Sequence, residues 1–251
     1  MKPYFDVDGI TIYLGNCLDV LPTLDQEIDC VIADPPYGTT DLPWDQLQTG
    51  WLNSAAEMLK PSGSMWIFGT LKIFVRDRDL FADQWKLIQD VIWEKHNGSN
   101  AFNDRFRNVH ESVVHFHLIQ TKWRDVYHKT VMTNDATQRR TLRRKTKTSH
   151  WSKIGSSTHA SYDGGPRLMR SVIRARSGHG GFHPTQKPIS LVRSLIEYSC
   201  PGNGIVLDPF MGVGTTLLAA KALGLRAVGI ECNQAYCDTA IERLRQEVLF
   251  T

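Results

Sequence analysis

The 251-residue sequence lacks the features that would assign it to the membrane, secreted or metal-binding classes of protein. No apolar run reaches the roughly 20 residues that a membrane-spanning helix needs. The first residues, MKPYFDVDGI, lack the charged and then apolar pattern of a signal peptide. The cysteines form no CxxC pair and show no Cys/His spacing typical of zinc. We therefore expect a cytoplasmic protein with reduced thiols and no metal site. The cysteines are Cys17, Cys30, Cys200, Cys232 and Cys237.

Positive charge is concentrated in one segment of the chain. Residues 122–176 hold 14 of the 29 basic residues but only three of the 26 acidic ones, so the remainder has 15 basic and 23 acidic residues. An acidic body with one strongly basic segment predicts a polyanionic partner, although a solvated surface loop has the same composition. Aromatic residues between these charges favour the first interpretation, because aromatic rings stack on bases. They are Trp123, Tyr127, Trp151 and Tyr162.

The rest of the chain alternates between short apolar stretches and amphipathic ones. We predict strands at residues 10–14, 28–33, 64–68, 88–93, 113–119, 205–207 and 227–230. We predict helical segments at residues 17–24, 51–59, 79–85, 189–198, 215–223 and 235–248. This alternation is typical of an α/β fold with a mainly parallel central sheet and helices on both faces. Residues 120–182 break the pattern and are interpreted as an insertion between two parts of one domain, 1–119 and 183–251.

A glycine turn follows the predicted strand 205–207. Gly212 and Gly214 allow the backbone to turn tightly and to approach a ligand closely, and Thr215 is placed to cap the next helix. The following strand ends at Glu231, where a carboxylate can accept hydrogen bonds from ribose hydroxyls. The spacing matches neither a GxGxxG pyrophosphate loop nor a P-loop, so S-adenosylmethionine fits this nucleoside site better than NAD or ATP. For the glycines alone, an ordinary turn at a helix start is the alternative.

Asp34, Pro35, Pro36 and Tyr37 follow the predicted strand 28–33, at the edge where parallel α/β sheets bind ligands. The prolines stiffen the loop and remove two N–H donors, which leaves carbonyl groups as acceptors. The Asp34 carboxylate and the Pro35 carbonyl can accept both N–H bonds of an exocyclic amino group and turn its lone pair toward a methyl donor. Tyr37 can stack on the base, which must leave the duplex to reach such a pocket. A rigid turn is the alternative, and the glycine turn elsewhere in the chain favours catalysis.

These motifs together resemble the DNA amino-methyltransferases, which make N6-methyladenine or N4-methylcytosine. Their order resembles the beta class of that family, in which the Rossmann-like methyltransferase sheet is circularly permuted. Joining residues 205–248 to the strand at residue 10 would restore one continuous winding, in agreement with that class. The segments similar to family motifs are 34–37, 58–64, 106–111, 183–188 and 208–214.

The resemblance implies roles for individual residues. Asp34, Pro35, Pro36 and Tyr37 would be catalytic. The glycine turn would contact the methionine part of S-adenosylmethionine, and Thr185 and Lys187 would lie near its carboxylate. Relatives often have Gly-Asp where this chain has Gly15-Asn16, and Asn16 can still bind an adenine edge. The residues expected to bind the cofactor are Asn16, Cys17, Asp34, Thr185, Lys187, Asp208, Pro209, Phe210, Gly212, Gly214, Thr215 and Glu231.

The basic segment would then be the target-recognition region for double-stranded DNA, unless it is only an exposed loop. Within the family an aspartate at position 34 favours the N6 amino group of adenine, and the N4 group of cytosine is the alternative. A DNA-binding module that keeps the fold without catalysis, and a methyltransferase for RNA or protein, are further alternatives. The resemblance also implies a homodimer. The expected phosphate contacts are Arg139, Arg140, Arg143, Arg144, Lys145 and Lys147.

Overall fold

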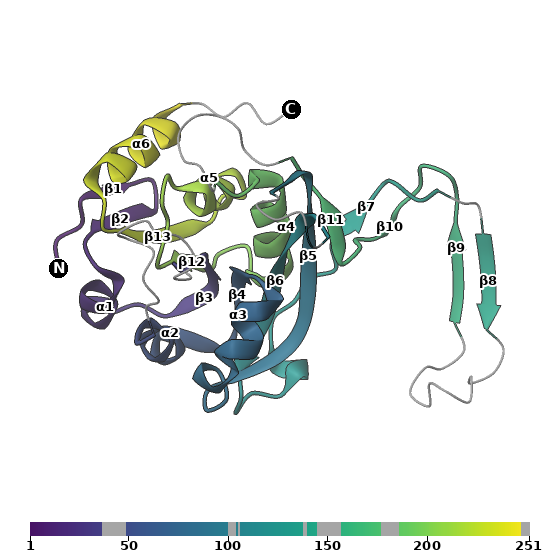
Figure 1. Ribbon diagram of the computed structural model, residues 1–251, viewed down its shortest axis with the longest axis horizontal. Coiled ribbons are helices and arrows are strands. Elements are labelled where there is room, and N and C mark those ends of the chain that lie inside the picture. The colour runs from purple at the N-terminus through teal and green to yellow at the C-terminus, as the bar shows by residue number, and fades with distance from the viewer. Residues whose placement is uncertain are drawn as a thin grey trace. The chain divides into compact units, whose positions relative to one another are not determined.

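The structure is a computed structural model that describes residues 1–36, 49–99, 104, 106–137, 140–144, 157–176 and 186–246. It divides the chain into two compact units. Residues 1–129 and 171–251 form the larger unit, and residues 130–170 form the smaller one. Figure 1 shows the secondary structure of both.

The larger unit is built from strands that alternate with helices. Its strands are β1 (Phe5–Val7), β2 (Ile10–Leu14), β3 (Ile28–Ala33), β4 (Leu59–Gly69), β5 (Trp85–Ser99), β6 (Asn108–Leu118), β11 (Val172–Arg174), β12 (Ile205–Asp208) and β13 (Arg226–Glu231). Its α-helices are α1 (Cys17–Val20), α2 (Trp51–Met58), α3 (Leu71–Arg76), α4 (Ile189–Ser199), α5 (Thr215–Ala222) and α6 (Gln234–Arg245). Short 3-10 helices lie at η1 (Leu21–Thr23), η2 (Arg78–Leu80) and η3 (Trp123–Asp125).

All of these strands belong to one sheet, in the order β1-β2-β13-β12-β3-β4-β6-β5-β11. The strands from β2 to β4 in this order are mutually parallel, and β6 pairs antiparallel with both β4 and β5. The chain winds outward from β3 to β4 on one side and from β12 to β13 on the other. Strands β3 and β12 therefore meet at a topological switch point, where open α/β sheets place their ligands.

The pairing of β13 with β2 joins the two ends of the chain's winding. These strands are parallel over five residue pairs, from Ala227 opposite Ile10 to Glu231 opposite Leu14. The last strand along the chain thus lies beside an early one, as the predicted continuous winding requires. The circularly permuted Rossmann-like methyltransferase fold is confirmed.

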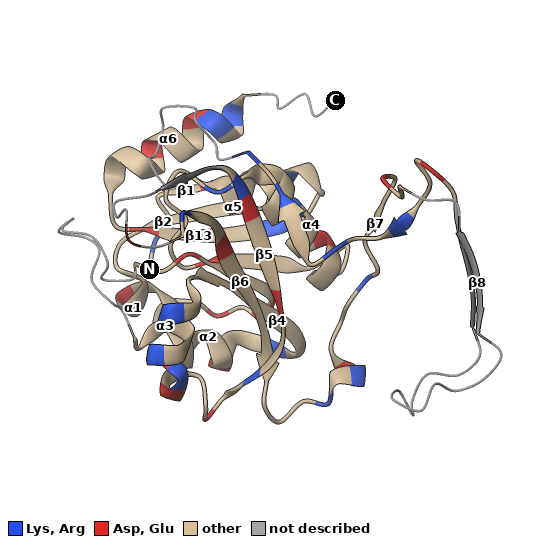
Figure 2. Ribbon diagram, turned by 45° about the vertical axis from the view of Figure 1, so that its right-hand side comes forward, with Lys and Arg blue, Asp and Glu red and all other residues tan. Residues whose placement is uncertain are grey.

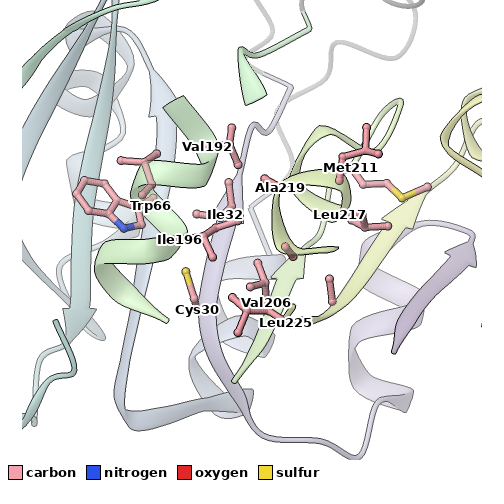
Figure 3. Packing of buried hydrophobic residues seen from close by; sticks show 14 of the residues in the cluster. Cys30, Ile32, Trp66, Val192, Ile196, Val206, Met211, Leu217, Ala219 and Leu225 are labelled. Atoms are coloured by element: carbon pink, nitrogen blue, oxygen red, sulfur yellow. The ribbon is translucent and has the colours of Figure 1, made fainter. Parts of the chain in front are cut away.

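The core lies on both faces of the sheet because the central strands are apolar on both sides. All six residues of β3 are buried, and their side chains alternate between two clusters. Cys30 and Ile32 pack on the face with Val206, while Val31 and Ala33 pack on the face with Leu207. Figure 3 shows the first cluster, in which side chains of the strands meet those of α4 and α5.

The helices cover the sheet in two layers, with α4, α5 and α6 against one face and α1 and α2 against the other (Figure 1). Each helix turns an apolar stripe to the sheet. In α4 the stripe is Leu191, Val192, Leu195 and Ile196, all at most 3% exposed. Asn233 caps α6, because its side-chain oxygen accepts a hydrogen bond from the Ala235 N–H at 2.9 Å. Figure 2 shows that α6 contains residues of both charges.

The smaller unit contains two antiparallel strand pairs. Strand β7 (Met132–Thr133) pairs with β10 (Arg167–Leu168), and β8 (Arg140–Arg144) pairs with β9 (Ser157–Ser161). Arg167 forms an ion pair with Asp135, with 2.5 Å between nitrogen and oxygen. Hydrogen bonds from Arg167 and Thr133 lower the pKa of Asp135 to about 2. Both interactions tie the ends of the β7–β10 pair together.

The separate unit is shorter than the insertion 120–182 expected from the sequence. Residues before it are bound to the sheet unit, because the Tyr127 N–H donates to the Ser62 carbonyl and the Lys129 N–H donates to the Tyr198 carbonyl. Residues after it form β11, which adds a parallel edge strand to β5. Backbone hydrogen bonds of this kind leave no periodic pattern in the side chains, so sequence periodicity does not mark them.

Some local secondary-structure predictions were wrong. The segment 79–85, predicted to be helical, contains the one-turn η2 and the start of β5. Helix α3 and strand β1 were not predicted, since each is short and exposes much of its apolar surface. Within the described part of the chain, no helix is long and apolar enough to cross a membrane.

Candidate active site

Three carboxylates lie at the carboxyl ends of neighbouring parallel strands in the centre of the sheet. Asp208 is the last residue of β12, Glu231 is the last residue of β13, and Asp34 follows β3 directly. Strand β12 pairs with both β13 and β3, so these three ends are neighbours. Two sequence motifs that are more than 170 residues apart therefore meet at the switch point.

The turn after β12 is held open by its glycines. Gly212 and Gly214 have φ angles of 51° and 78°, in the left-handed region that side chains disfavour. A Cβ on Gly214 would lie 2.9 Å from the Cβ of Ala240, whereas a Cβ on Gly212 would have no neighbour within 4 Å. The turn therefore packs tightly against α6 at Gly214 and leaves room for a ligand in front of Gly212.

Gly214, and not Thr215, is the N-terminal cap of α5, which corrects the sequence prediction. The left-handed φ of Gly214 turns the chain into the helix, and Thr215 is already its first helical residue. Thr215 is buried at 7% exposure. The next residue, Thr216, makes a side-chain hydrogen bond with Asp208 instead.

Asp208 is a buried carboxylate held by dipoles. Its Oδ1 accepts the Phe210 N–H at 3.0 Å. Burial raises the pKa of Asp208 to about 7, the hydrogen bonds from Thr216 and Phe210 oppose that rise, and the negative charges of Asp34 and Glu231 add to it. A cation in front of the loop would relieve this repulsion.

Glu231 ties the glycine turn to the next strand. One of its carboxylate oxygens accepts the Gly212 N–H at 3.1 Å, and the other accepts the Asn233 N–H at 2.8 Å. The second oxygen also accepts the Cys232 thiol at 3.5 Å, whereas the oxygen bound to Gly212 keeps a further lone pair for a ligand hydroxyl. The expected ribose contact is compatible with these bonds.

Asn16 and Cys17 lie beside Glu231, just after β2. The Gly15 N–H donates to the Glu231 carbonyl at 2.9 Å, which draws the two strand ends together. The Asn16 side-chain oxygen accepts the Leu18 N–H at 3.0 Å and so caps α1. Burial raises the pKa of Cys17 to about 11, so its thiol is neutral at ordinary pH.

The loop after β3 contains the predicted catalytic residues. Pro35 is buried, while Asp34 and Pro36 are partly exposed. Phe210, from the glycine turn, packs against Trp51 of α2 edge to face, with 5.3 Å between ring centroids. Tyr37 lies outside the described residues, as does Thr185.

Lys187 lies against Asp34, and its expected place near the cofactor's carboxylate stays a prediction. Its Nζ is 2.5 Å from Asp34 Oδ2 and 3.4 Å from Glu111 Oε2. It also lies over the ring of Phe68, 5.2 Å from the centroid. Burial lowers the pKa of Lys187, but the charges of Asp34 and Glu111 outweigh that effect and raise it.

Glu111 is a site residue to which sequence reasoning gave no role. It belongs to β6 and also forms an ion pair with Lys95 of β5. Burial raises the pKa of Glu111, but the ammonium groups of Lys187 and Lys95 outweigh it and hold that pKa below its ordinary range. The sequence signal that could have identified Glu111 was its position at the end of segment 106–111, which is similar to a family motif.

Comparison with known families decides what this arrangement is. A family described as DNA methylase, of the N6/N4 type, matches residues 28–242. The chain belongs to this family. It is a DNA amino-methyltransferase whose cofactor is S-adenosylmethionine.

Two curated relatives of this DNA methylase match along nearly its whole length. Type II methyltransferase M.HinfI of Haemophilus influenzae is 33% identical, over 94% of this chain and 68% of the relative. Type II methyltransferase M2.DpnII of Streptococcus pneumoniae is 28% identical, over 98% of this chain and 93% of the relative.

Solved structures share the fold of the methylase. The M1.HpyAVI–SAM complex aligns with a TM-score of 0.67 and 24% identity, over 93% of this chain and 99% of that one. The cytosine-N4-specific PvuII DNA methyltransferase aligns with a TM-score of 0.68 and 16% identity, over 99% and 90%. At these identities the likeness concerns the fold alone.

The basic residues expected to contact DNA belong to the smaller unit of the methylase. Arg140, Arg143 and Arg144 are part of β8. Arg139, Lys145 and Lys147 lie outside the described residues. The DNA contacts of all six stay a prediction.

Proposed function

We propose that this chain transfers a methyl group from S-adenosylmethionine to the N6 amino group of adenine in double-stranded DNA. The observation that carries the proposal is the meeting of Asp34 with the Asp208–Gly214 turn at the switch point of the sheet. This puts an acceptor for amino N–H bonds beside a glycine turn suited to a nucleoside.

The residues of the glycine turn fit the chemistry of S-adenosylmethionine. The space in front of Gly212 is open, and the carboxylates of Asp208 and Glu231 lie at the ends of neighbouring strands. These carboxylates suit a positively charged molecule with ribose hydroxyls. When bound, the cofactor supplies an electrophilic methyl group on a sulfonium.

Asp34 and Pro35 would act on the amino group of the base. The Asp34 carboxylate and the Pro35 carbonyl accept its two N–H bonds, which turns the nitrogen lone pair away from the ring and toward the methyl donor. The base must first leave the duplex. Positioning and electrostatics then provide most of the rate enhancement. Tyr37 is proposed to stack on the flipped base.

Digestion of methylated DNA to nucleosides tests the identity of the base. Duplex DNA is incubated with the protein and labelled S-adenosylmethionine, digested, and analysed by chromatography and mass spectrometry. We expect N6-methyladenine. N4-methylcytosine without N6-methyladenine would instead support the second candidate, methylation of cytosine N4, which the matching family also includes.

Removal of the Asp34 carboxylate tests catalysis against a DNA-binding module without activity. We expect Asp34→Ala to lower the single-turnover rate about 10³-fold, because charge-developing steps depend on preorganised acceptors and donors. Asp6→Ala, an exposed acid on β1, is the matched control and should keep the full rate. Full methylation by a folded Asp34→Ala variant would contradict the mechanism.

The smaller unit is proposed to bind DNA through its basic residues. Neutralising six phosphates releases their counterions, so affinity should fall steeply with salt. The cytoplasmic location and the homodimer stay predictions. Sedimentation with and without DNA measures the oligomeric state directly.

A further inference from the structure

Four charged side chains from three distant parts of the sequence form one chain of ion pairs. Asp34 follows β3, Lys187 precedes α4, and Glu111 and Lys95 lie on the paired strands β6 and β5. The contacts run from Asp34 to Lys187, from Lys187 to Glu111, and from Glu111 to Lys95. The two carboxylates balance the two ammonium groups.

We propose that Lys187 and Glu111, supported by Lys95, position the Asp34 carboxylate for methyl transfer. This inference rests on the proposed function of Asp34 as acceptor for the amino group. It assigns Lys187 to the catalytic loop rather than to the cofactor, and it gives Glu111 and Lys95 roles as positioning residues.

Burial of Lys187 is the first argument. Its side chain is only 9% exposed, and an ammonium group removed from water must be paired. The pairing is with carboxylates on both sides, at 2.5 Å and 3.4 Å. A lysine held in this way is already paired within the protein. Its ammonium group therefore holds the Asp34 carboxylate in place.

The rigidity of the anchor is the second argument. Glu111 lies next to Ser112, which pairs with Gly69 at the end of β4, so it stands at the same edge of the sheet as Asp34. Its strand β6 is paired with β5 at Glu111 and with β4 from Ser112 onward. The Nζ of its partner Lys95 lies 4.9 Å from the centroid of the buried Trp93 ring. Asp34, in contrast, sits in a loop. The ion pairs connect that loop to the sheet.

The position of the contact on Asp34 is the third argument. Lys187 binds Oδ2, and holding one oxygen of a carboxylate sets the plane of the whole group. A hydrogen bond to an amino group depends on that plane.

The experiment compares Lys187→Met, Lys187→Arg and Glu111→Gln with the wild type. The control is Lys60→Met, which removes the ammonium from another ion pair of a buried carboxylate, Asp29, at 2.9 Å. Single-turnover rates are measured at saturating DNA and cofactor, as a function of pH. Dissociation constants are measured for S-adenosylmethionine and for duplex DNA with 2-aminopurine at the target base, whose fluorescence reports flipping.

We expect a loss of rate without a loss of binding. Lys187→Met should slow transfer at least tenfold across the pH range, and Lys187→Arg should recover part of the rate. Glu111→Gln is nearly isosteric and keeps the Lys187–Asp34 pair, so it should fold and slow transfer several-fold. Cofactor affinity and 2-aminopurine fluorescence should change less than threefold, and Lys60→Met should match the wild type.

Two results would overturn the positioning role. One is an unchanged rate in both Lys187→Met and Glu111→Gln. The other is a tenfold weaker affinity for S-adenosylmethionine with an unchanged rate at saturation, which would return Lys187 to the cofactor. Failure of the proposed function is seen separately, as transfer by the wild type to something other than a DNA base, and the same variants then test positioning on that substrate.

Discussion

Two aspartates at the ends of neighbouring strands are held in different ways. Asp34 has an ammonium group 2.5 Å from one carboxylate oxygen, and that ammonium is itself anchored by Glu111. Asp208 is more deeply buried and is held by the dipoles of the Phe210 N–H and the Thr216 hydroxyl. The first environment stabilises a negative charge, whereas the second opposes one.

This difference indicates a division of labour between Asp34 and Asp208, which lie at the carboxyl ends of neighbouring strands. A carboxylate that accepts bonds from an amino group must be fixed before the base arrives, and the ion pair with Lys187 holds Asp34 in place. A carboxylate that faces a cationic cofactor can receive its counter-charge from the ligand. Burial raises the pKa of Asp208 to about 7, so its charge depends on what is bound beside it.

The glycine turn after β12 depends on its backbone conformation, and Gly214→Ala should have the largest effect on stability. The new Cβ would lie 2.9 Å from that of Ala240, at a φ of 78°. We expect the free energy of unfolding to fall by about 2–4 kcal/mol, through overpacking and backbone strain together.

Urea denaturation measures that change, with Gly202→Ala as control. A Cβ on Gly202 would have no neighbour within 4 Å, so this variant should stay within about 0.5 kcal/mol of the wild type. Equal stability of the two variants would show that the turn does not pack as described.

The pH dependence of stability tests the environment of Asp208. Because its pKa rises from 3.8 to about 7 on folding, the folded protein holds a proton that the unfolded chain has lost. The resulting stabilisation is complete below pH 3.8 and disappears as the pH rises toward 7. Asp208→Asn has no such proton to lose, so at pH 8.5 it should exceed the wild type in stability by at least about 1 kcal/mol.

Denaturation of both proteins at pH 5 and pH 8.5, without cofactor, gives the comparison. The advantage of Asp208→Asn should shrink at the lower pH. An advantage that does not vary with pH would mean that Asp208 does not change its charge over this range, which would contradict the described environment.

Asn16→Asp should have the smallest effect. A carboxylate can accept the Leu18 N–H as Asn16 does, and a negative charge near the start of α1 adds about 0.3–1 kcal/mol of stability. We expect a two- to fivefold tighter binding of S-adenosylmethionine, measured by calorimetry. Weaker binding would place residue 16 away from the cofactor. Asn16→Ala loses the hydrogen bond that caps α1, so it measures the loss of stability that is due to the cap alone.

The meeting of two strand ends was predictable because it follows from strong, local signals. An apolar strand ending at Asp34 and another ending at Asp208 are visible in the sequence, and parallel strands put their carboxyl ends on the same side of a sheet. The join between β13 and β2 was expected from the resemblance to the beta class, in which the winding is circularly permuted.

The partners of Lys187 were not predictable in that way. Its contact with Glu111 depends on how β6 is placed beside β4 in the sheet, and one sequence does not specify that pairing. The cap of α5 was wrong for a similar reason, since Thr215 is a good capping residue and only the left-handed φ of Gly214 shows where the helix begins. Residues 120–129 and 171–176 attach to the sheet unit through backbone hydrogen bonds and through scattered side chains such as Trp123 and Val126, which form no periodic pattern.

The most direct test of the division of labour measures Asp34→Asn and Asp208→Asn side by side. For each, the single-turnover rate at saturating cofactor and the dissociation constant of S-adenosylmethionine are determined. We predict that Asp34→Asn loses at least 100-fold in rate with a nearly unchanged dissociation constant, whereas Asp208→Asn raises that constant at least tenfold and keeps most of the rate at saturation. The opposite pattern, or the same pattern in both variants, would contradict the account.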